Sequence, residues 1–148
     1  MRQSIPHALM DYVSGLAAHD VARIAAAVSD ELLFISATRI LGKAQFLEML
    51  DALYKGFPDW RYEYDKIEDR GQGNYAIKWR QGGTHTGIWS MPGMQAVPAT
   101  GRRVQIEPHY FFYRIGGGDK LVLIFPEPAV GGAPRGILEQ LCVDVPPL

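Results

Sequence analysis

The sequence has little of what marks a secreted, membrane-spanning or nucleic-acid-binding protein. Its one cysteine, Cys142, cannot form a disulfide within the chain. Apolar runs such as Leu121–Phe125 fall far short of the ~20 residues that cross a bilayer. The 15 basic and 16 acidic residues nearly cancel, so no basic surface for phosphates is expected. The N-terminal segment also lacks the basic and apolar regions of a secretory signal. We therefore expect a soluble, cytoplasmic protein that binds neither nucleic acid nor membrane.

Motifs for metals and nucleotides are missing as well. The histidines at positions 7, 19, 85 and 109 are scattered and show no ligand spacing, so no metal site is predicted. The glycines at 116–118 precede an expected strand and not a helix, which indicates a hairpin turn and not a phosphate-binding loop. No cofactor is expected.

Helical spacing is found mainly in the first 60 residues. Apolar residues from Ser4 to Ala17 recur at the period of a helix, with Ser4 as a candidate N-cap. Asp20 is a suitable cap for a second short helix that ends near residue 29. A brief strand is expected at 32–35. Gly42 then opens a third helix, and the stop at 56–59 ends it.

After residue 59 the apolar period changes from that of helices to that of strands. Residues 60–65 and 75–80 alternate between aromatic or apolar and charged, and the turn at 71–74 is expected to join them as a hairpin. Two longer strands are expected at 103–115 and 120–125, and a final helix at 135–143. With 47% hydrophobic residues and no linker, residues 1–148 are predicted to form one α+β domain whose helices pack on one face of a curved antiparallel sheet.

Several short blocks in this order resemble the SnoaL-like polyketide cyclases of the nuclear transport factor 2-like superfamily. They are residues 57–63 (FPDWRYE), 76–79 (AIKW) leading into 83–87 (GTHTG), and 98–104 (PATGRRV), with 41–43 and 138–141 at the two ends. The resemblance covers nearly the whole chain. It implies a cone-shaped α+β barrel with the helices on the concave face of the sheet, and a homodimer or larger oligomer formed through the outer face. Some family members close a polyketide ring by an aldol reaction without a metal or cofactor.

The resemblance also implies an acidic residue at the end of the last long strand and a histidine on the neighbouring strand. The position that commonly holds aspartate is Pro126 here, and Glu127 follows it. Strand alternation would turn Glu127 to the opposite face unless the flanking prolines or a bulge re-aim it. A carboxylate base and an imidazole would suffice for an aldol closure, so Glu127 and His109 are the candidate catalytic pair. The alternative is a solvated strand-end glutamate and an ordinary half-buried histidine.

Other side chains are candidates for lining a ligand pocket. Trp79, Tyr62 and Tyr12 could contact an apolar ligand, with Phe111 beside them, although aromatic residues in these patterns also simply fill a core. His85 could orient a ligand, or its side chain could form hydrogen bonds with the backbone of its own turn. The loop that carries Trp89, Met91 and Met94 is unusually apolar, which suggests a flexible lid or a dimer contact.

Two functions remain open from the sequence. The first is a cofactor-free cyclase or isomerase that acts on a small hydrophobic carbonyl compound by general acid/base chemistry. The second is a non-catalytic module that uses the same cone to bind a small ligand or to dimerise. In both cases a homodimer is expected.

Overall fold

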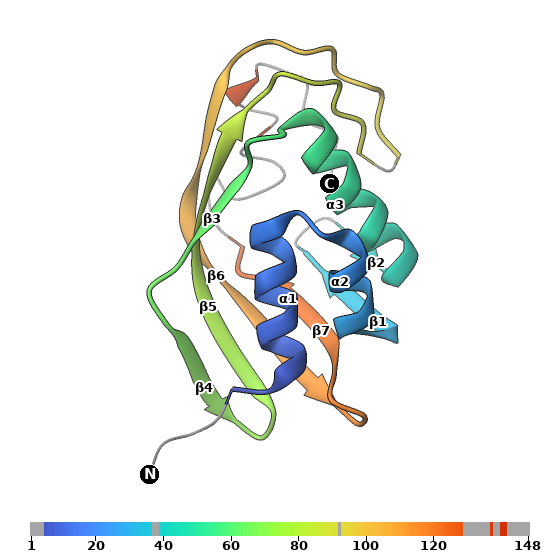
Figure 1. Ribbon diagram of the computed structural model, residues 1–148, viewed down its shortest axis with the longest axis vertical. Coiled ribbons are helices and arrows are strands. Elements are labelled where there is room, and N and C mark those ends of the chain that lie inside the picture. Colours follow the sequence, from blue (N-terminus) through green and yellow to red (C-terminus); the bar gives the residue numbers. More distant parts are fainter. Residues whose placement is uncertain (1–4, 37–38, 92, 129–136, 138–139, 142–148) are drawn as a thin grey trace.

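The computed structural model describes residues 5–36, 39–91, 93–128, 137 and 140–141, and confirms an α+β fold (Figure 1). The elements follow the order α1 (His7–Ala18), α2 (Val21–Ala27), β1 (Val28–Ile35), β2 (Ile40–Leu41), α3 (Lys43–Gly56), β3 (Arg61–Glu63), β4 (Ile67–Gly71), β5 (Asn74–Thr84), β6 (Arg103–Gly116) and β7 (Lys120–Pro126). None of the helices among these residues is long and apolar enough to cross a membrane.

The helices begin and end where local chemistry allows. The Asp20 side chain accepts a hydrogen bond from the Arg23 amide, so the predicted N-cap of α2 is confirmed. Gly42 caps α3 as expected. Helix α1 starts directly after Pro6 and ends at His19, which adopts the left-handed conformation. The proposed cap Ser4 lies outside the described residues, as does most of the predicted helix at 135–143.

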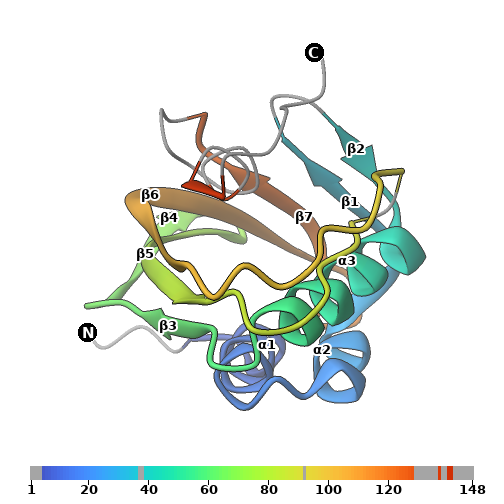
Figure 2. The same cartoon turned by 90° about the horizontal axis from the view of Figure 1, so that it is seen from above.

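The sheet has seven strands in the order β2-β1-β7-β6-β5-β3, and β4 also pairs with β5. Most pairs are antiparallel, but β1 runs parallel to β7, so the sheet is mixed and not purely antiparallel as predicted. The parallel pair arises because α3 and the whole β3–β6 segment separate β1 from β7 in the sequence. Helices α1, α2 and α3 lie on the same side of the curved sheet (Figure 2).

The strand predicted at 60–65 does pair with β5, but the two are not joined as a hairpin by the turn at 71–74. The turn at 71–74 joins β4 to β5, with Ile67 opposite Ile77. Strand β3 pairs with the far half of β5, where Arg61 lies opposite Gly82. Residues 64–66 interrupt the extended segment, so one edge of β5 is covered by two short strands in succession.

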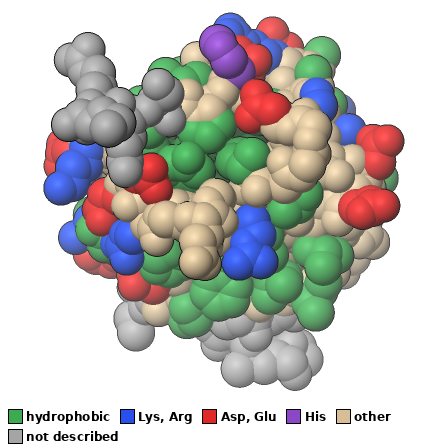
Figure 3. Space-filling view, turned by 90° about the horizontal axis from the view of Figure 1, so that it is seen from below, with side chains coloured by type: hydrophobic (Ala, Val, Ile, Leu, Met, Phe, Trp, Pro, Cys, Tyr) green, Lys and Arg blue, Asp and Glu red, His purple; other side chains and the backbone are tan. Residues whose placement is uncertain are grey.

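The interior consists of two clusters of buried side chains. The first lies between α1, α2, α3 and strands β1, β5, β6 and β7, and includes Leu9, Phe46, Ile77 and Ile124. On the surface seen from below, hydrophobic side chains lie together near the middle, with charged side chains among and around them (Figure 3). The second cluster, which we call the loop cluster, joins the end of α3 to residues 86–101 and consists of Ala52, Phe57, Trp60, Trp89, Met91, Val97, Val104, Ile106, Ile137 and Leu141.

Candidate functional site: an aromatic cavity between sheet and helices

A cavity of about 70 Å³ lies where the two clusters meet, between the inner face of the sheet, α1, α3 and the 86–101 loop. For comparison, a cavity of about 150 Å³ is enough to bind benzene. The cavity is thus small, and its lining includes the unbranched, flexible side chains of Met49 and Met91. The lining side chains are Tyr12, Leu16, Phe34, Phe46, Met49, Leu50, Leu53, Tyr62, Trp79, Gln81, Trp89, Met91, Phe111, Tyr113 and Ile137.

At the sheet side of the cavity the polar groups bind one another. Trp79 Nε1 donates to the Tyr113 hydroxyl at 2.7 Å, and both side chains are buried. The ring of Tyr12 packs against that of Tyr113 with centroids 5.6 Å apart. Burial raises the pKa of Tyr12 and of Tyr113, so both phenols are neutral at physiological pH. They can donate a hydrogen bond but cannot serve as anionic bases.

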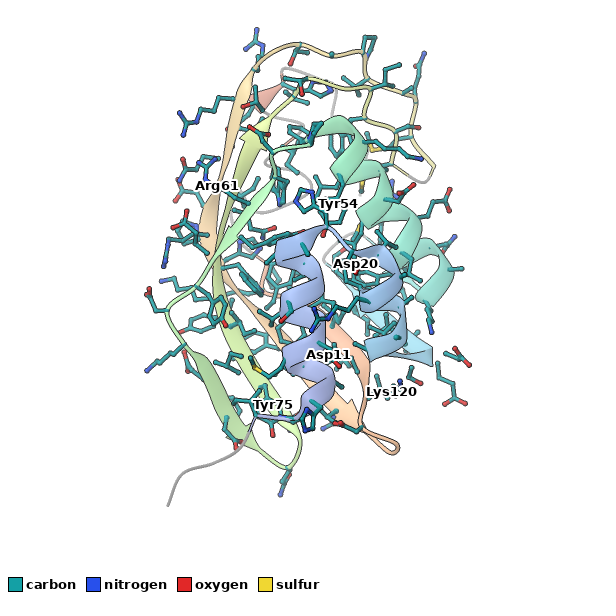
Figure 4. The ribbon with its side chains drawn as sticks, in the orientation of Figure 1. Asp11, Asp20, Tyr54, Arg61, Tyr75 and Lys120 are labelled. Atoms are coloured by element: carbon teal, nitrogen blue, oxygen red, sulfur yellow. The ribbon has the colours of Figure 1, made fainter. Side chains whose placement is uncertain are left out.

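A second pair of tyrosines lies at the edge of the cavity near β3. The hydroxyls of Tyr54 and Tyr62 are 2.7 Å apart, and burial raises the pKa of both groups. Tyr54 extends from α3 toward the end of α1 (Figure 4), where its ring stacks on His19 at 4.0 Å. His19 Nε2 in turn donates to the Trp60 carbonyl at 2.6 Å. This chain of contacts positions Tyr62 against Trp79.

The loop side of the cavity differs, because its donors are not all used. Trp89 is 1% exposed, and its indole N–H has no acceptor among the described residues. Gln81 lies opposite Tyr62 in the β3–β5 pair, and its Oε1 accepts from Trp60 Nε1 at 3.3 Å. An indole can only donate, so the amide oxygen faces Trp60 and the amide NH₂ is turned away from it.

Four of the five predicted pocket residues line this cavity: Tyr12, Tyr62, Trp79 and Phe111. They do so because alternate residues of β5 and β6 face the helices, and because Tyr12 lies on the buried side of α1. Whether they contact a ligand remains a prediction.

His85 is fully buried but does not line the cavity. Its ring stacks on Phe57 at 5.1 Å, and its Nδ1 accepts from the Thr100 amide at 3.3 Å. Since Nδ1 is an acceptor, the proton of the neutral ring sits on Nε2, which has no partner in hydrogen-bonding geometry among the described residues. Desolvation lowers the pKa of His85, although the Val97 carbonyl opposes this in part.

Neither member of the candidate catalytic pair, His109 and Glu127, belongs to the cavity lining. His109 is buried opposite Trp79 on the inner face of the sheet, 5.1 Å from the ring of Phe111, and its Nδ1 lies 2.9 Å from the Glu107 carbonyl. Glu127 follows β7, where its Oε1 accepts from the Tyr110 amide at 3.3 Å. No hydrogen bond joins the two residues in the described part of the chain.

The loop with Trp89 and Met91 is part of the protein core. Both side chains are buried within a single chain, and Met94 packs against them. Their burial accounts for the apolar composition of the loop without a dimer contact, so that alternative is wrong for Trp89 and Met91. They cover the cavity, as a lid would; whether they move stays a prediction.

The chemical character of the cavity follows from its lining. No carboxylate, amine or imidazole belongs to the lining among the described residues, and burial raises the pKa of all three lining phenols, Tyr12, Tyr62 and Tyr113. A charged ligand would lose its hydration with no opposite charge to replace it. The cavity is therefore suited to a neutral, mainly apolar molecule with one or two hydrogen-bonding groups.

The sequence interpretation missed Gln81, Trp89 and Tyr113 as polar groups of one cavity. Gln81 and Tyr113 are each two residues from a predicted pocket residue on the same strand, so alternation could have found them. Trp89 lies in an irregular loop, where no periodicity indicates the direction of a side chain.

A model of the SnoaL-like domain matches residues 9–124 of the chain. The match includes α1 to β7 up to Ile124, and therefore nearly every element that lines the cavity. Comparison with the sequences of curated proteins found no match.

Solved structures with the same fold are similar over most of their length. AclR of Streptomyces galilaeus, a proposed hydroxylase, has 21% identity and a TM-score of 0.70 over 91% of this chain and 92% of its own. A proposed SnoaL-like polyketide cyclase from Jannaschia sp. CCS1 has 16% identity and a TM-score of 0.70 over 99% of both chains. A SnoaL-like polyketide cyclase from Agrobacterium tumefaciens has 20% identity and a TM-score of 0.64 over 95% and 99%. Identities this low show the fold alone.

Proposed function

We propose a function on the premise that the chain belongs to the SnoaL-like domain family, as the match over residues 9–124 shows. The protein binds a small, neutral, mainly apolar carbonyl compound in the cavity between sheet and helices. The observation that carries this proposal is the lining itself, which combines aromatic and aliphatic walls with neutral hydrogen-bond donors and has no charged group among the described residues. Cyclase and isomerase chemistry on carbonyl compounds is consistent with the family.

Binding is tested with ligands that differ in charge but little in shape. Cyclohexanone is expected to raise the melting temperature, whereas cyclohexanecarboxylate at the same concentration is not, because burying the anion is costly. A ligand at ~100 times its dissociation constant would add ~2.7 kcal/mol of stability. Stabilisation by the carboxylate alone would contradict the proposal.

A cavity-filling variant locates the binding site. Leu50 lines the cavity, so Leu50→Phe should abolish the shift with cyclohexanone. Leu47 is on the same helix and half-buried but does not line the cavity, so Leu47→Phe is the matched control and should keep the shift. Equal loss in both variants, or in neither, would place binding elsewhere.

Catalysis is a second candidate, favoured by the buried imidazole of His109 against the lining residue Phe111. In this alternative Glu127 removes a proton alpha to the carbonyl with His109 as its polar partner, so a ligand must extend past Phe111 and its oxygen would not lie at Trp89. Hydrogen exchange at the alpha carbon of cyclohexanone in D₂O, followed by NMR, measures this step. Wild type should accelerate the exchange, and Glu127→Gln should lose most of it while still binding the ketone. An unchanged rate in Glu127→Gln would exclude Glu127 as the base.

We also propose that two copies associate through the outer face of the sheet. Tyr110 and Phe112 stack there, with Phe125 beside them and the Arg70 guanidinium 5.6 Å from the Tyr110 centroid. All three rings are only half-buried in a single chain. Sedimentation should show a dimer that Phe112→Glu converts to a 16.5 kDa monomer. A monomeric wild type at micromolar concentration would contradict this proposal.

A further inference from the structure

Two buried tryptophans line the same cavity but differ in what their indole N–H groups bind. Trp79 donates to Tyr113, whereas Trp89 has no acceptor among the described residues. Leaving a buried donor unpaired costs about 1–3 kcal/mol, so such groups are rare in folded proteins and call for an explanation. Since Trp89 lines the cavity, the acceptor that would remove this cost can come from a ligand.

The position of Trp89 is tightly constrained, so its donor cannot easily turn elsewhere. Its backbone exchanges two hydrogen bonds with Val97, at 3.0 and 2.7 Å. Gly56 at the end of α3 allows close approach, because a Cβ there would lie 2.6 Å from the Trp89 Cβ. The Phe57 ring meets the indole edge-on at 5.7 Å. These contacts hold the indole in place before any ligand arrives.

Gln81 supplies a second donor to the same cavity. Its amide oxygen accepts from Trp60, so the NH₂ group of the same amide is the part left to donate to a ligand. Gln81 is 7% exposed and lies on β5, a central strand of the sheet. The amide is thus both buried and rigidly supported.

We propose that Trp89 and Gln81 select the ligand by donating hydrogen bonds to its carbonyl oxygen. This inference rests on the proposed function, and adds which end of the cavity holds the oxygen and which ligands are rejected. The indole N–H and the amide NH₂ can only donate, so a ligand that pairs with them needs an acceptor such as the oxygen of a ketone, ester or lactone. The apolar body of the ligand then lies toward Phe34, Phe46 and Phe111, where the tyrosine and tryptophan groups are already paired.

A matched pair of probes separates this inference from simple apolar binding. Cyclohexanone and methylenecyclohexane have nearly the same shape, but only the ketone has an acceptor oxygen. The chain has three tryptophans, so the ¹⁵N-labelled protein shows three indole N–H signals, and Trp89→Phe identifies one of them. Saturation with cyclohexanone should shift the Trp89 signal downfield, as a new hydrogen bond does, while methylenecyclohexane should leave it nearly unchanged.

The affinities provide the second readout. Wild type should bind cyclohexanone about tenfold more tightly than methylenecyclohexane. This ratio corresponds to the free energy of one hydrogen bond to a buried donor. Trp89→Phe and Gln81→Met should each reduce that preference. If either variant fails to fold, the Trp89 signal in the wild type still shows whether the ketone accepts a hydrogen bond from Trp89. Trp60→Phe and Trp79→Phe then assign that signal by elimination.

The outcomes distinguish the two proposals. Binding of both probes with equal affinity and no ketone-specific shift of the Trp89 signal would overturn the donor role but leave the apolar cavity as a binding site. Binding of neither probe would overturn the proposed function and this inference together. An unchanged preference for the ketone over methylenecyclohexane in Gln81→Met would assign the selection to Trp89 alone and overturn the role of Gln81.

Discussion

Trp79 and Trp89 line two regions of the cavity that differ in how a buried indole N–H group is hydrogen-bonded. Both indoles are almost completely buried, at 2% and 1% exposure. On the sheet side, Trp79, Tyr113 and Tyr12 form a group whose polar atoms contact one another. On the loop side, Trp89 retains a buried nitrogen without a partner among the described residues, as does His85, which lies outside the cavity lining. Complete pairing favours a structural role, whereas unpaired donors in a rigid setting favour ligand binding.

The largest expected effect concerns the close packing of the loop on α3. A Cβ at Gly87 would overlap the Lys55 carbonyl oxygen, and backbone cannot move aside as a side chain can. Gly87→Ala should therefore cost about 3 kcal/mol of unfolding free energy in urea titration. Gly117 has nothing within 4 Å of such a Cβ, so Gly117→Ala is the control and should change stability little. Similar stability of both variants would show that the loop is not held in place by α3.

The next effect tests the hydrogen bond between Trp79 and Tyr113 on the sheet side of the cavity. Tyr113→Phe removes the acceptor of Trp79 Nε1 and leaves that donor buried, which should cost about 2 kcal/mol. The same titration measures it. A cost below about 0.5 kcal/mol would mean that the hydrogen bond contributes little, and that the contrast between the two tryptophans has no energetic basis.

A smaller effect is expected when the two indoles are compared directly. Trp79→Phe and Trp89→Phe remove the same atoms, but only Trp79 loses a hydrogen bond to a protein group. Trp89→Phe should cost about 1 kcal/mol in the ligand-free protein, and Trp79→Phe about twice that. A larger loss for Trp89→Phe would indicate that its N–H is paired after all.

The last effect appears only in acid. Burial holds the pKa of His85 below its ordinary value of about 6.5, so below that pH the unfolded chain binds a proton that the folded chain does not. Stability should fall as the pH drops through about 6.5 toward the folded-state pKa of His85. Chemical denaturation between pH 7 and 5 should show a shallower fall in His85→Gln than in wild type. Identical slopes would mean that His85 contributes nothing to the acid sensitivity.

Much of the fold could be predicted because strands and helices leave periodic patterns. Alternation along 75–80 and 103–115 predicted β5 and β6 and the inward direction of Trp79 and Phe111. Periodicity carries no information on pairing partners, so the hairpin at 71–74 was assigned to the wrong strand and the parallel contact of β1 with β7 was not foreseen.

The candidate site was less predictable, because it depends on packing between distant segments. Tyr12 and Tyr62 could be proposed from their faces, but the lack of an acceptor for Trp89 depends on Gly56, Phe57 and Val97 together. His85 was proposed from a turn motif and is buried against Phe57 instead of lining the cavity. The roles of Glu127 and His109 stay predictions, since neither residue lines the cavity.

A crystal structure of the protein soaked in cyclohexanone would test the central claim most directly. The account predicts the ketone in the aromatic cavity, with its oxygen about 3 Å from Trp89 Nε1 and its ring toward Phe111. A ketone bound only on the surface would contradict the proposed function. A ketone in the cavity with its oxygen directed at Tyr113 would contradict the assignment of the loop-side donors.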